Sequence, residues 1–275
     1  ALKDAGRDVV VIDDMSRGNR AMLPADVPLI EADICDAAAV GALFTEYRPT
    51  AMMHLAARSL VGESVEIPLD YYRVNVEGTR LLVETGKRHG LRAIVYSSTA
   101  SVYGAPERQP ITEDDPKQPE NPYGASKLTG EWVLQDSERA GGPACMVLRY
   151  FNAAGADPAG RCGQVGPASH LVKVAAQAVT GERGGLVIHG TDYPTPDGTC
   201  IRDYIHVADL AEAHLLWLKF LENEKRGMSF NLGNERGTSV REIIDAVHRV
   251  TGKNIPVREA GRREGDPPVL VGSSA

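Results

Sequence analysis

Three side chains of the types that oxidise alcohols stand near one another in the middle of this sequence. Tyr123 and Lys127 are four positions apart, so on a helix they share one face. A phenol has a pKa near 10, and a base that works at neutral pH needs that value shifted by roughly 3 units, or about 4 kcal/mol. The ammonium of Lys127 supplies part of that stabilisation. Thr99 or Ser98 would then hydrogen-bond the substrate hydroxyl and hold its proton toward Tyr123.

Local signals place these side chains at the edge of a sheet. Asn121-Pro122 is typical of a helix start, with Asn as the N-cap and Pro at the first position, so Tyr123 lies in the first turn. The apolar run 93–96 predicts a buried parallel strand, which puts Ser98 and Thr99 at its carboxyl end, where open α/β sheets bind ligands. A Tyr and a Lys with this spacing are, taken alone, usually mere neighbours on a helix surface. This context favours the catalytic interpretation.

The rest of the first half predicts the frame for such a site. Strand-like runs at 9–12, 29–32, 51–55, 93–96 and 144–149 alternate with helical patterns at 37–47, 71–89 and 123–140. This alternation predicts an α/β fold with a doubly wound parallel sheet of the Rossmann type. After Phe151 come longer loops at 152–166 and 189–199, and helices near 170–180 and 207–222. We therefore expect a dinucleotide-binding domain at 1–150 and a mainly substrate-binding α/β lobe at 151–275, with a strand near 229–232 returning to the main sheet.

The run at 9–12 carries the signal for a cofactor. It ends in Asp13 and Asp14, where the second strand of a dinucleotide fold presents a carboxylate to the adenosine ribose. Acid there repels a 2′-phosphate, so NAD is favoured over NADP, and its cationic ring would add to the positive charge near Tyr123. The glycine-rich phosphate loop normally lies ~20 residues before such an acid, which is earlier than Ala1. We therefore expect a truncated N-terminus that lacks the first strand and this loop, and weakened cofactor binding as a result.

The composition limits which classes of partner and which cellular location we expect. The net charge is -7 and no basic cluster relieves it, which argues against nucleic-acid binding. The four cysteines form no CxxC pair, so we expect reduced thiols and no metal site. No apolar stretch approaches the ~20 residues that span a bilayer, and the first residues do not resemble a secretion signal. We expect a cytoplasmic protein that binds neither membrane nor nucleic acid.

Several longer segments are more specific than the tyrosine and lysine. They are His54-Leu55-Ala56-Ala57, Val61-Gly62-Glu63-Ser64, Asn75-Val76-Glu77-Gly78-Thr79, Ser97-Ser98-Thr99-Ala100-Ser101-Val102-Tyr103-Gly104, Leu148-Arg149-Tyr150-Phe151-Asn152, Asp192-Tyr193-Pro194-Thr195, Arg202-Asp203-Tyr204-Ile205-His206-Val207 and Arg262-Arg263-Glu264-Gly265-Asp266. Through them the chain, from Val9 onward, resembles the extended short-chain dehydrogenase/reductase family.

The resemblance implies a redox-neutral reaction at C4 of a UDP-hexose. Tyr123 would remove the proton of the 4-hydroxyl as hydride passes from C4 to NAD, and the 4-keto sugar would then turn over and take the hydride back on its other face. UDP-glucose and UDP-galactose would thus interconvert, with NAD bound throughout. The family resemblance also implies a homodimer.

Matching positions imply the residues of both sites. The cofactor would be lined by Asp13, Asp14, Asp33, Ile34, Leu55, Ala56, Ala57, Asn75, Tyr123, Lys127 and Phe151. The UDP-sugar would be held by Thr99, Tyr123, Asn152, His170, Leu171, Val187, Ile188, His189, Arg202, Arg263, Asp266 and Leu270. The guanidinium groups of Arg202 and Arg263 suit a diphosphate, whereas His170 and His189 have a packing role as the alternative.

The chain departs from the family pattern at a few positions. Thr99 stands where serine is frequent and keeps the hydroxyl, whereas Ser59 stands where a lysine can contact the cofactor. The chain ends at Ala275, and we expect this to be short of the family's C-terminal helices. Leu270 matches a position that gates the size of the sugar's 2-substituent, so UDP-N-acetyl sugars are a further hypothesis.

Other functions stay open on the sequence alone. Relatives of the same type act on N-acetylhexosamines, pentoses or uronic acids. A sugar-nucleotide 4,6-dehydratase needs an acid pair directly after the Ser/Thr, where this chain has Ala100 and Ser101, so that function ranks lower. A non-catalytic nucleotide-sensing protein would have no need for Thr99, Tyr123 and Lys127 together.

Overall fold

The structure is a computed structural model that describes residues 1–165, 170–224, 226–263 and 265–273. Gly166, at the end of an expected loop, and Glu264, within one of the sequence motifs, lie outside the described residues. The chain forms two units, the first made of 1–104, 116–149 and 211–230 and the second of 105–115, 150–210 and 231–275. In this division the segment 105–115 belongs to unit 2 and the segment 211–230 to unit 1, each across the expected boundary after residue 150.

Parallel strands form the frame of unit 1. β3 (Ala51–His54), β4 (Ala93–Thr99), β5 (Ala144–Tyr150) and β9 (Met228–Leu232) lie side by side in that order. β1 (Val11–Asp13) and β2 (Leu29–Glu31) pair in parallel in a sheet of their own. Within the described residues no strand joins β1 to β3, so the strands fall into two sheets. The expected α/β fold with parallel strands is confirmed.

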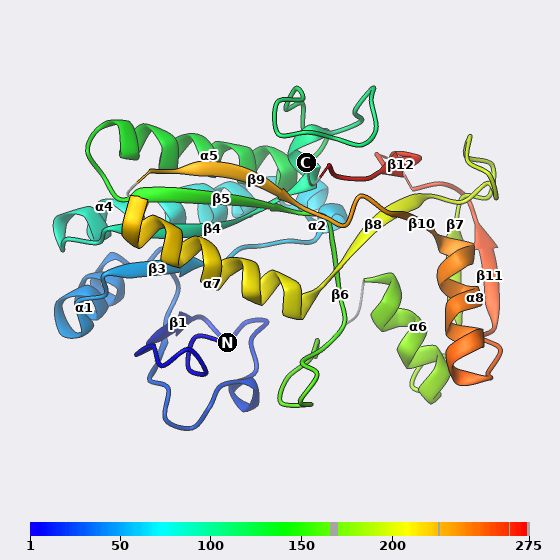
Figure 1. Ribbon diagram of the computed structural model, residues 1–275, viewed down its shortest axis with the longest axis horizontal. Coiled ribbons are helices and arrows are strands. Elements are labelled where there is room, and N and C mark those ends of the chain that lie inside the picture. Colours follow the sequence, from blue (N-terminus) through cyan, green and yellow to red (C-terminus); the bar gives the residue numbers. More distant parts are fainter. Residues whose placement is uncertain (166–169, 225, 264, 274–275) are drawn as a thin grey trace. The chain divides into compact units, whose positions relative to one another are not determined.

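Helices cover both faces of the four-stranded sheet. α1 (Ala37–Tyr47), α4 (Thr79–Arg88) and α5 (Pro122–Arg139) contact one another in succession, and α7 (Val207–Glu224) lies on the opposite face from α5 (Figure 1). One core joins these helices to β4. In it, Phe44 of α1, Leu82 of α4 and Leu134 of α5 pack with Ile94 and Tyr96. The predicted helices at 37–47 and 123–140 are confirmed to within a residue.

The stretch 71–89, expected as one helix, is divided. α3 (Pro68–Tyr72) is followed by a π-helical turn, η2 (Arg73–Gly78), and then by α4. π-helical turns are rare in proteins, and those that occur often lie at functional sites. This one carries the buried Asn75. The remaining elements of unit 1 are α2 (Val61–Glu66) and the 3-10 turns η1 (Arg20–Met22) and η3 (Ala100–Tyr103).

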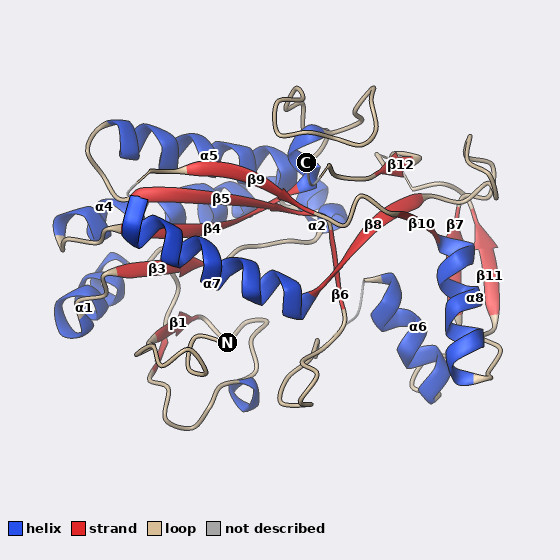
Figure 2. Cartoon of the chain, in the orientation of Figure 1, coloured by secondary structure: helices blue, strands red, loops and turns tan. Residues whose placement is uncertain are grey.

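Unit 2 contains more regular structure than its sequence indicates. β8 (Ile201–His206) pairs with β6 (Asn152–Ala154), β10 (Gly237–Ser239) and β12 (Val269–Leu270). β7 (Leu186–His189) pairs in parallel with β11 (Val257–Ala260), and α6 (Leu171–Thr180) and α8 (Val240–Thr251) flank this second pair (Figure 2). α8 was not expected, although its start is a capping box between Ser239 and Glu242.

Three findings concern membrane spans, cysteines and metal ions. Across the described residues, no helix is both long enough and apolar enough to cross a bilayer. All four cysteines are free thiols. Within the same residues, no group of three or more His, Cys, Asp or Glu side chains is arranged to hold a metal ion.

Candidate active site

The start of α5 is held close to β4 and η3. The Oδ1 atom of Asn121 accepts the N–H of Gly124 at 2.9 Å, which makes Asn121 the N-cap as predicted. A Cβ on Gly124 would clash with the carbonyl of Ser101, and one on Gly130 would clash with the hydroxyl of Tyr96. The two glycines thus let α5 approach the end of β4 closely enough to bring Tyr123 beside Thr99.

The side chains of Tyr123 and Thr99, both predicted catalytic residues, lie within hydrogen-bond reach of each other. Burial raises the pKa of Tyr123, and a hydrogen bond with the Thr99 hydroxyl opposes that rise. The Thr99 oxygen also accepts the N–H of Ser101 at 3.1 Å, and the ring of Tyr71 meets the ring of Tyr123 edge-on at 6.4 Å. The pKa of Tyr123 therefore moves in the direction opposite to the expected one, because loss of water outweighs the hydrogen bond.

Lys127 is buried one turn further along α5. Its side chain is 2% exposed, and its Nζ atom lies 4.2 Å from the centre of the Tyr96 ring. Burial lowers the pKa of this amine to about 7, while the charge of Glu131 opposes the change. The face of an aromatic ring stabilises a cation by about 2 kcal/mol when the pair is desolvated. Lys127 thus titrates near neutral pH, unlike an ordinary lysine.

Asn75 ties the loop after β3 to α5. Its side-chain amide donates to the carbonyl of Arg58 at 3.0 Å and to Oγ of Ser126 at 2.9 Å, and its Oδ1 accepts the N–H of Arg58 at 2.8 Å. Ser126 in turn donates to the carbonyl of Tyr123 at 2.8 Å. Asn75, a predicted cofactor residue, therefore holds the first turn of α5 in place through Ser126.

The carboxyl ends of β1 and β2 present acidic side chains. Asp13 accepts the N–H of Met15 at 2.8 Å, and Asp14 accepts the N–H of Ser16 at 2.9 Å. Asp33 pairs with Arg73 at 2.8 Å. Carboxylate oxygens at the end of such a strand suit the hydroxyl groups of an adenosine ribose, so the donor chemistry of the site fits a dinucleotide.

The other predicted cofactor residues of unit 1 differ in exposure. Leu55, which is exposed, and Ala56 and Ala57, which are half-buried, directly follow the carboxyl end of β3. The acidic side chains likewise lie at the carboxyl ends of β1 and β2. Ile34 instead belongs to the core, and a Cβ on Gly78 would clash with it. A packing role therefore accounts for Ile34.

Unit 2 brings several predicted substrate residues together. Arg202 donates to Asp266 at 2.5 Å and to the carbonyl of Ile201 at 2.8 Å. Leu270 of β12 stands opposite Arg202 of β8. Burial lowers the pKa of His189; Arg263 adds to the effect and Asp266 opposes it, so these charges lie near the imidazole.

The remaining predicted residues of unit 2 have separate places. Ile188 of β7 is buried in a core against which Leu171 packs, and Phe151 is buried beside Gly272, where a Cβ would clash with its ring. Val187 is half-buried on β7, and Asn152 of β6 stands opposite Tyr204. His170 is exposed and precedes α6.

A buried polar network beside Lys127 was not predicted from the sequence. Glu131 accepts hydrogen bonds from Ser98 and Arg149, and Arg149 also donates to the hydroxyl of Tyr103 at 2.8 Å. The hydroxyl of Ser98 donates to Glu131, so of the two candidate hydroxyls it is that of Thr99 that hydrogen-bonds Tyr123. One feature of the sequence points to Glu131: it follows Lys127 by four positions, so the two side chains share a face of the helix.

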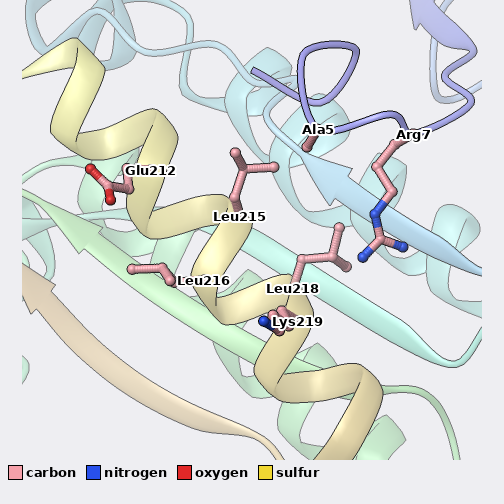
Figure 3. Close-up of a pocket in the computed structure, with 7 residues that line it drawn as sticks. All are labelled: Ala5, Arg7, Glu212, Leu215, Leu216, Leu218 and Lys219. Carbon is pink, nitrogen blue, oxygen red and sulfur yellow. The ribbon is translucent and has the colours of Figure 1, made fainter.

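A pocket of about 450 Å³ lies elsewhere in unit 1. Figure 3 shows Ala5 and Arg7 of the N-terminal segment across from Leu215 and Leu218 of α7. Its lining side chains are Ala5, Arg7, Glu212, Leu215, Leu216, Leu218 and Lys219. None of these seven is a predicted site residue, so this pocket is separate from the chemistry of Tyr123.

Fold and site together define a class. A parallel α/β unit with acids after β1, a threonine at the end of β4, and a tyrosine and a buried lysine on the following helix is a dinucleotide-dependent protein of the short-chain dehydrogenase/reductase type. A family model described as the NAD dependent epimerase/dehydratase family matches residues 1–233. The chain belongs to this family.

Individual relatives agree over almost the whole chain. A UDP-glucose 4-epimerase of Azospirillum brasilense is 53% identical over 272 residues, which are 98% of this chain and 78% of that protein. The crystal structure of UDP-glucose 4-epimerase from Brucella ovis in complex with NAD has a TM-score of 0.94 and 43% identity, covering 99% of this chain and 84% of its own. The enzyme of the same name from Bifidobacterium longum, in complex with NAD+ and UDP, has a TM-score of 0.93 and 35% identity, with coverage of 99% and 84%.

Proposed function

We propose that this chain is an NAD-dependent UDP-glucose 4-epimerase, which inverts C4 of UDP-glucose or UDP-galactose through a transient 4-keto sugar. The observation that carries the proposal is the grouping of Thr99, Tyr123 and Lys127, with the tyrosine hydroxyl in reach of the threonine and the lysine buried on the same helix face. Membership of the family and the length of the match to UDP-glucose 4-epimerases support it.

Each of the three side chains has one task. Thr99 orients the sugar hydroxyl and hydrogen-bonds Tyr123, and Tyr123 takes the proton from that hydroxyl and later returns it. Lys127 contributes positive charge that favours the phenolate. Because burial raises the pKa of Tyr123, the tyrosine acts as a base only when positive charge surrounds it.

The residues that would hold NAD lie at strand ends of unit 1. Asp13 and Asp14 would accept hydrogen bonds from the adenosine ribose, and Lys127 would serve the nicotinamide side. When bound, NAD supplies the acceptor and the donor for the hydride at C4. The oxidation and the reduction cancel, so the reaction consumes no cofactor.

The test is conversion of UDP-galactose that carries deuterium at C4, with NAD and without added reductant. The proposal predicts UDP-glucose with the deuterium still on C4, because hydride leaves and returns to one carbon. Loss of the label to solvent, or no UDP-glucose at saturating NAD, would refute it. A 4,6-dehydratase would instead release a stable 4-keto-6-deoxy sugar, and the buried Ala100 after Thr99 offers no acid for that elimination.

The nature of the sugar's 2-substituent is a finer proposal. Leu270 stands opposite Arg202, and its aliphatic side chain is smaller than an aromatic one. We infer that UDP-N-acetylhexosamines are accepted as well as UDP-hexoses.

We also infer that two copies of the chain pair through α2, α3 and α5. These helices contact one another and expose large apolar side chains, among them Leu69 at 80%, Val65 at 65% and Trp132 at 55%. Exposed apolar surface of this kind marks interaction sites. Light scattering of the chain and of Leu69→Glu tests this: a dimer that becomes a monomer supports the inference, and a monomeric parent contradicts it.

The compartment is inferred from the cysteines. Four free thiols, among them the exposed Cys162, suit a reducing compartment. We infer a cytoplasmic location, which localisation of a fluorescent fusion in the source cell would test.

A further inference from the structure

A carboxylate is fully enclosed beside the Tyr123–Lys127 pair. Glu131 Oε1 accepts the hydroxyl of Ser98 at 2.5 Å and Nε of Arg149 at 3.0 Å, and Oε2 accepts Nη2 of Arg149 at 2.7 Å. The side chain of Glu131 is 1% exposed and that of Arg149 is 4% exposed. The network therefore joins β4, α5 and β5 inside unit 1.

Such a pair needs an explanation, because burying two charges is costly. The desolvation of a buried ion pair offsets much of its attraction, and apolar replacements are often as stable. The proposed chemistry gives no task to Glu131 or Arg149. Their position supplies one, since Tyr123, Lys127 and Glu131 follow one another at intervals of four along the same face of α5.

Glu131 acts on Lys127 directly. Its negative charge favours the ammonium form, whereas burial favours the neutral amine and brings the pKa to about 7. Without this carboxylate, the buried amine of Lys127 would lose the negative charge that opposes its deprotonation. With it, the ammonium form of Lys127 is favoured, and a cation on the helix turn next to Tyr123 favours the phenolate there.

The other titratable groups around Lys127 do not replace this carboxylate. His54 of β3 is buried, and its pKa is lowered to about 3 by burial and by Lys127, so it is neutral. Burial raises the pKa of Tyr96 of β4 and of Tyr71 of α3, so both stay phenols at neutral pH. Tyr103 of η3 hydrogen-bonds Arg149.

We propose that Glu131, held by Ser98 and Arg149 one turn along α5, is a positioning residue that keeps the amine of Lys127 charged for the proton transfer at Tyr123. Its carboxylate is enclosed by the protein, and it acts through Lys127. The expected effect of Glu131 on turnover rests on the proposed function. The effect of Glu131 on the protonation of Lys127 can be measured without substrate.

The experiment follows the amine and the reaction in parallel. The Nζ signal of Lys127 is titrated by NMR in the protein with 15N-labelled lysine, assigned by its loss in Lys127→Met. In Glu131→Gln we expect the midpoint to fall by about one pH unit, which is a tenfold change in the protonation equilibrium. At pH 7.5 we expect kcat to fall about tenfold with KM for UDP-galactose nearly unchanged, and Glu131→Asp to restore most of both. Asp136→Asn, which removes an exposed carboxylate from the same helix, is the control and should change neither.

A second variant, expected to shift the titration midpoint of Lys127 in the opposite direction, covers the case in which Glu131→Gln fails to fold. Arg149→Met leaves the carboxylate facing Lys127 without its other cation, so the lysine midpoint should rise. An unchanged midpoint in a folded Glu131→Gln, or a fall in Arg149→Met, overturns the proposal while the proposed function stands. If Tyr123→Phe retains turnover, the proposed function fails, and the NMR result still decides whether Glu131 controls the lysine.

Discussion

Arg202 and Asp266 form an ion pair at 2.5 Å, although both are predicted to contact the UDP-sugar. The guanidinium also donates to the carbonyl of Ile201 at 2.8 Å. These contacts hold the fork of Arg202 in one orientation, and an arginine oriented in this way suits a diphosphate. In the proposed function, the pair would therefore orient this arginine toward the diphosphate of the UDP-sugar.

Arg202→Met should weaken UDP binding by about 10-fold to 100-fold, the range expected for loss of a charged hydrogen bond. Calorimetry with UDP measures this, and Arg241→Met, which removes an exposed ion pair with Glu259, is the control. Equal UDP affinity in Arg202→Met and the parent would remove Arg202 from the binding site.

Leu270→Tyr should lower kcat/KM for UDP-N-acetylgalactosamine far more than for UDP-galactose, because the larger ring fills the space of the acetyl group. Steric exclusion of this kind is worth about 1–3 kcal/mol, or roughly 10-fold to 200-fold. Parallel assays on both substrates give the ratio. A variant that loses both activities equally would mean that Leu270 does not sort substrates by size.

The buried imidazole of His54 should make unfolding depend on pH. Its pKa is lowered from 6.5 to about 3 by burial, and its Nε2 atom lies 2.8 Å from the Thr79 hydroxyl. The unfolded chain takes up a proton below pH 6.5 and the native chain does not until about pH 3. The stability that the neutral imidazole of His54 contributes is therefore complete above pH 6.5, and it falls by about 1.4 kcal/mol per pH unit below that value. Urea unfolding at several pH values should show a smaller slope in His54→Gln than in the parent or in the exposed-site control His248→Gln; equal slopes would contradict the prediction.

Lys127→Met should raise the free energy of unfolding while abolishing turnover. Burial lowers the pKa of Lys127 from 10.5 to about 7, so between these values the unfolded chain holds a proton that the native chain lacks. The parent therefore gains stability as the pH rises through this window, and at pH 7 it carries the full cost of the buried amine. An apolar side chain removes that cost and should add about 1–3 kcal/mol at pH 7, a gain that shrinks toward pH 10. Lys87→Met, at an exposed site, should change stability little, and a destabilised Lys127→Met would contradict this reading of the amine.

The sequence predicts local features of this protein better than its long-range contacts. Asn121, Tyr123 and Lys127 were assigned correctly to the start of a helix because a cap and a spacing of four are written in consecutive residues. The pairing of Glu131 with Arg149 joins a helix to a strand, and no local pattern indicates which buried charges will meet. The direction of the pKa shift at Tyr123 was missed for the same reason, since burial depends on the whole fold.

Unit 2 illustrates the same limit. Its short strands pair across long stretches of sequence, as β12 does with β8, and isolated runs of two to four residues carry little periodicity. The helix α8 is different, because the capping box of Ser239 and Glu242 is a local signal that predicts its start.

The most direct test of the account is the turnover of Tyr123→Phe. The substitution removes one hydroxyl, keeps the ring against Tyr71, and leaves Thr99 and Lys127 in place. We predict that conversion of UDP-galactose falls by about a thousandfold, within the range of general base catalysis, while UDP affinity measured by calorimetry stays unchanged. Turnover that persists at the parent's rate with the phenol gone would contradict the account.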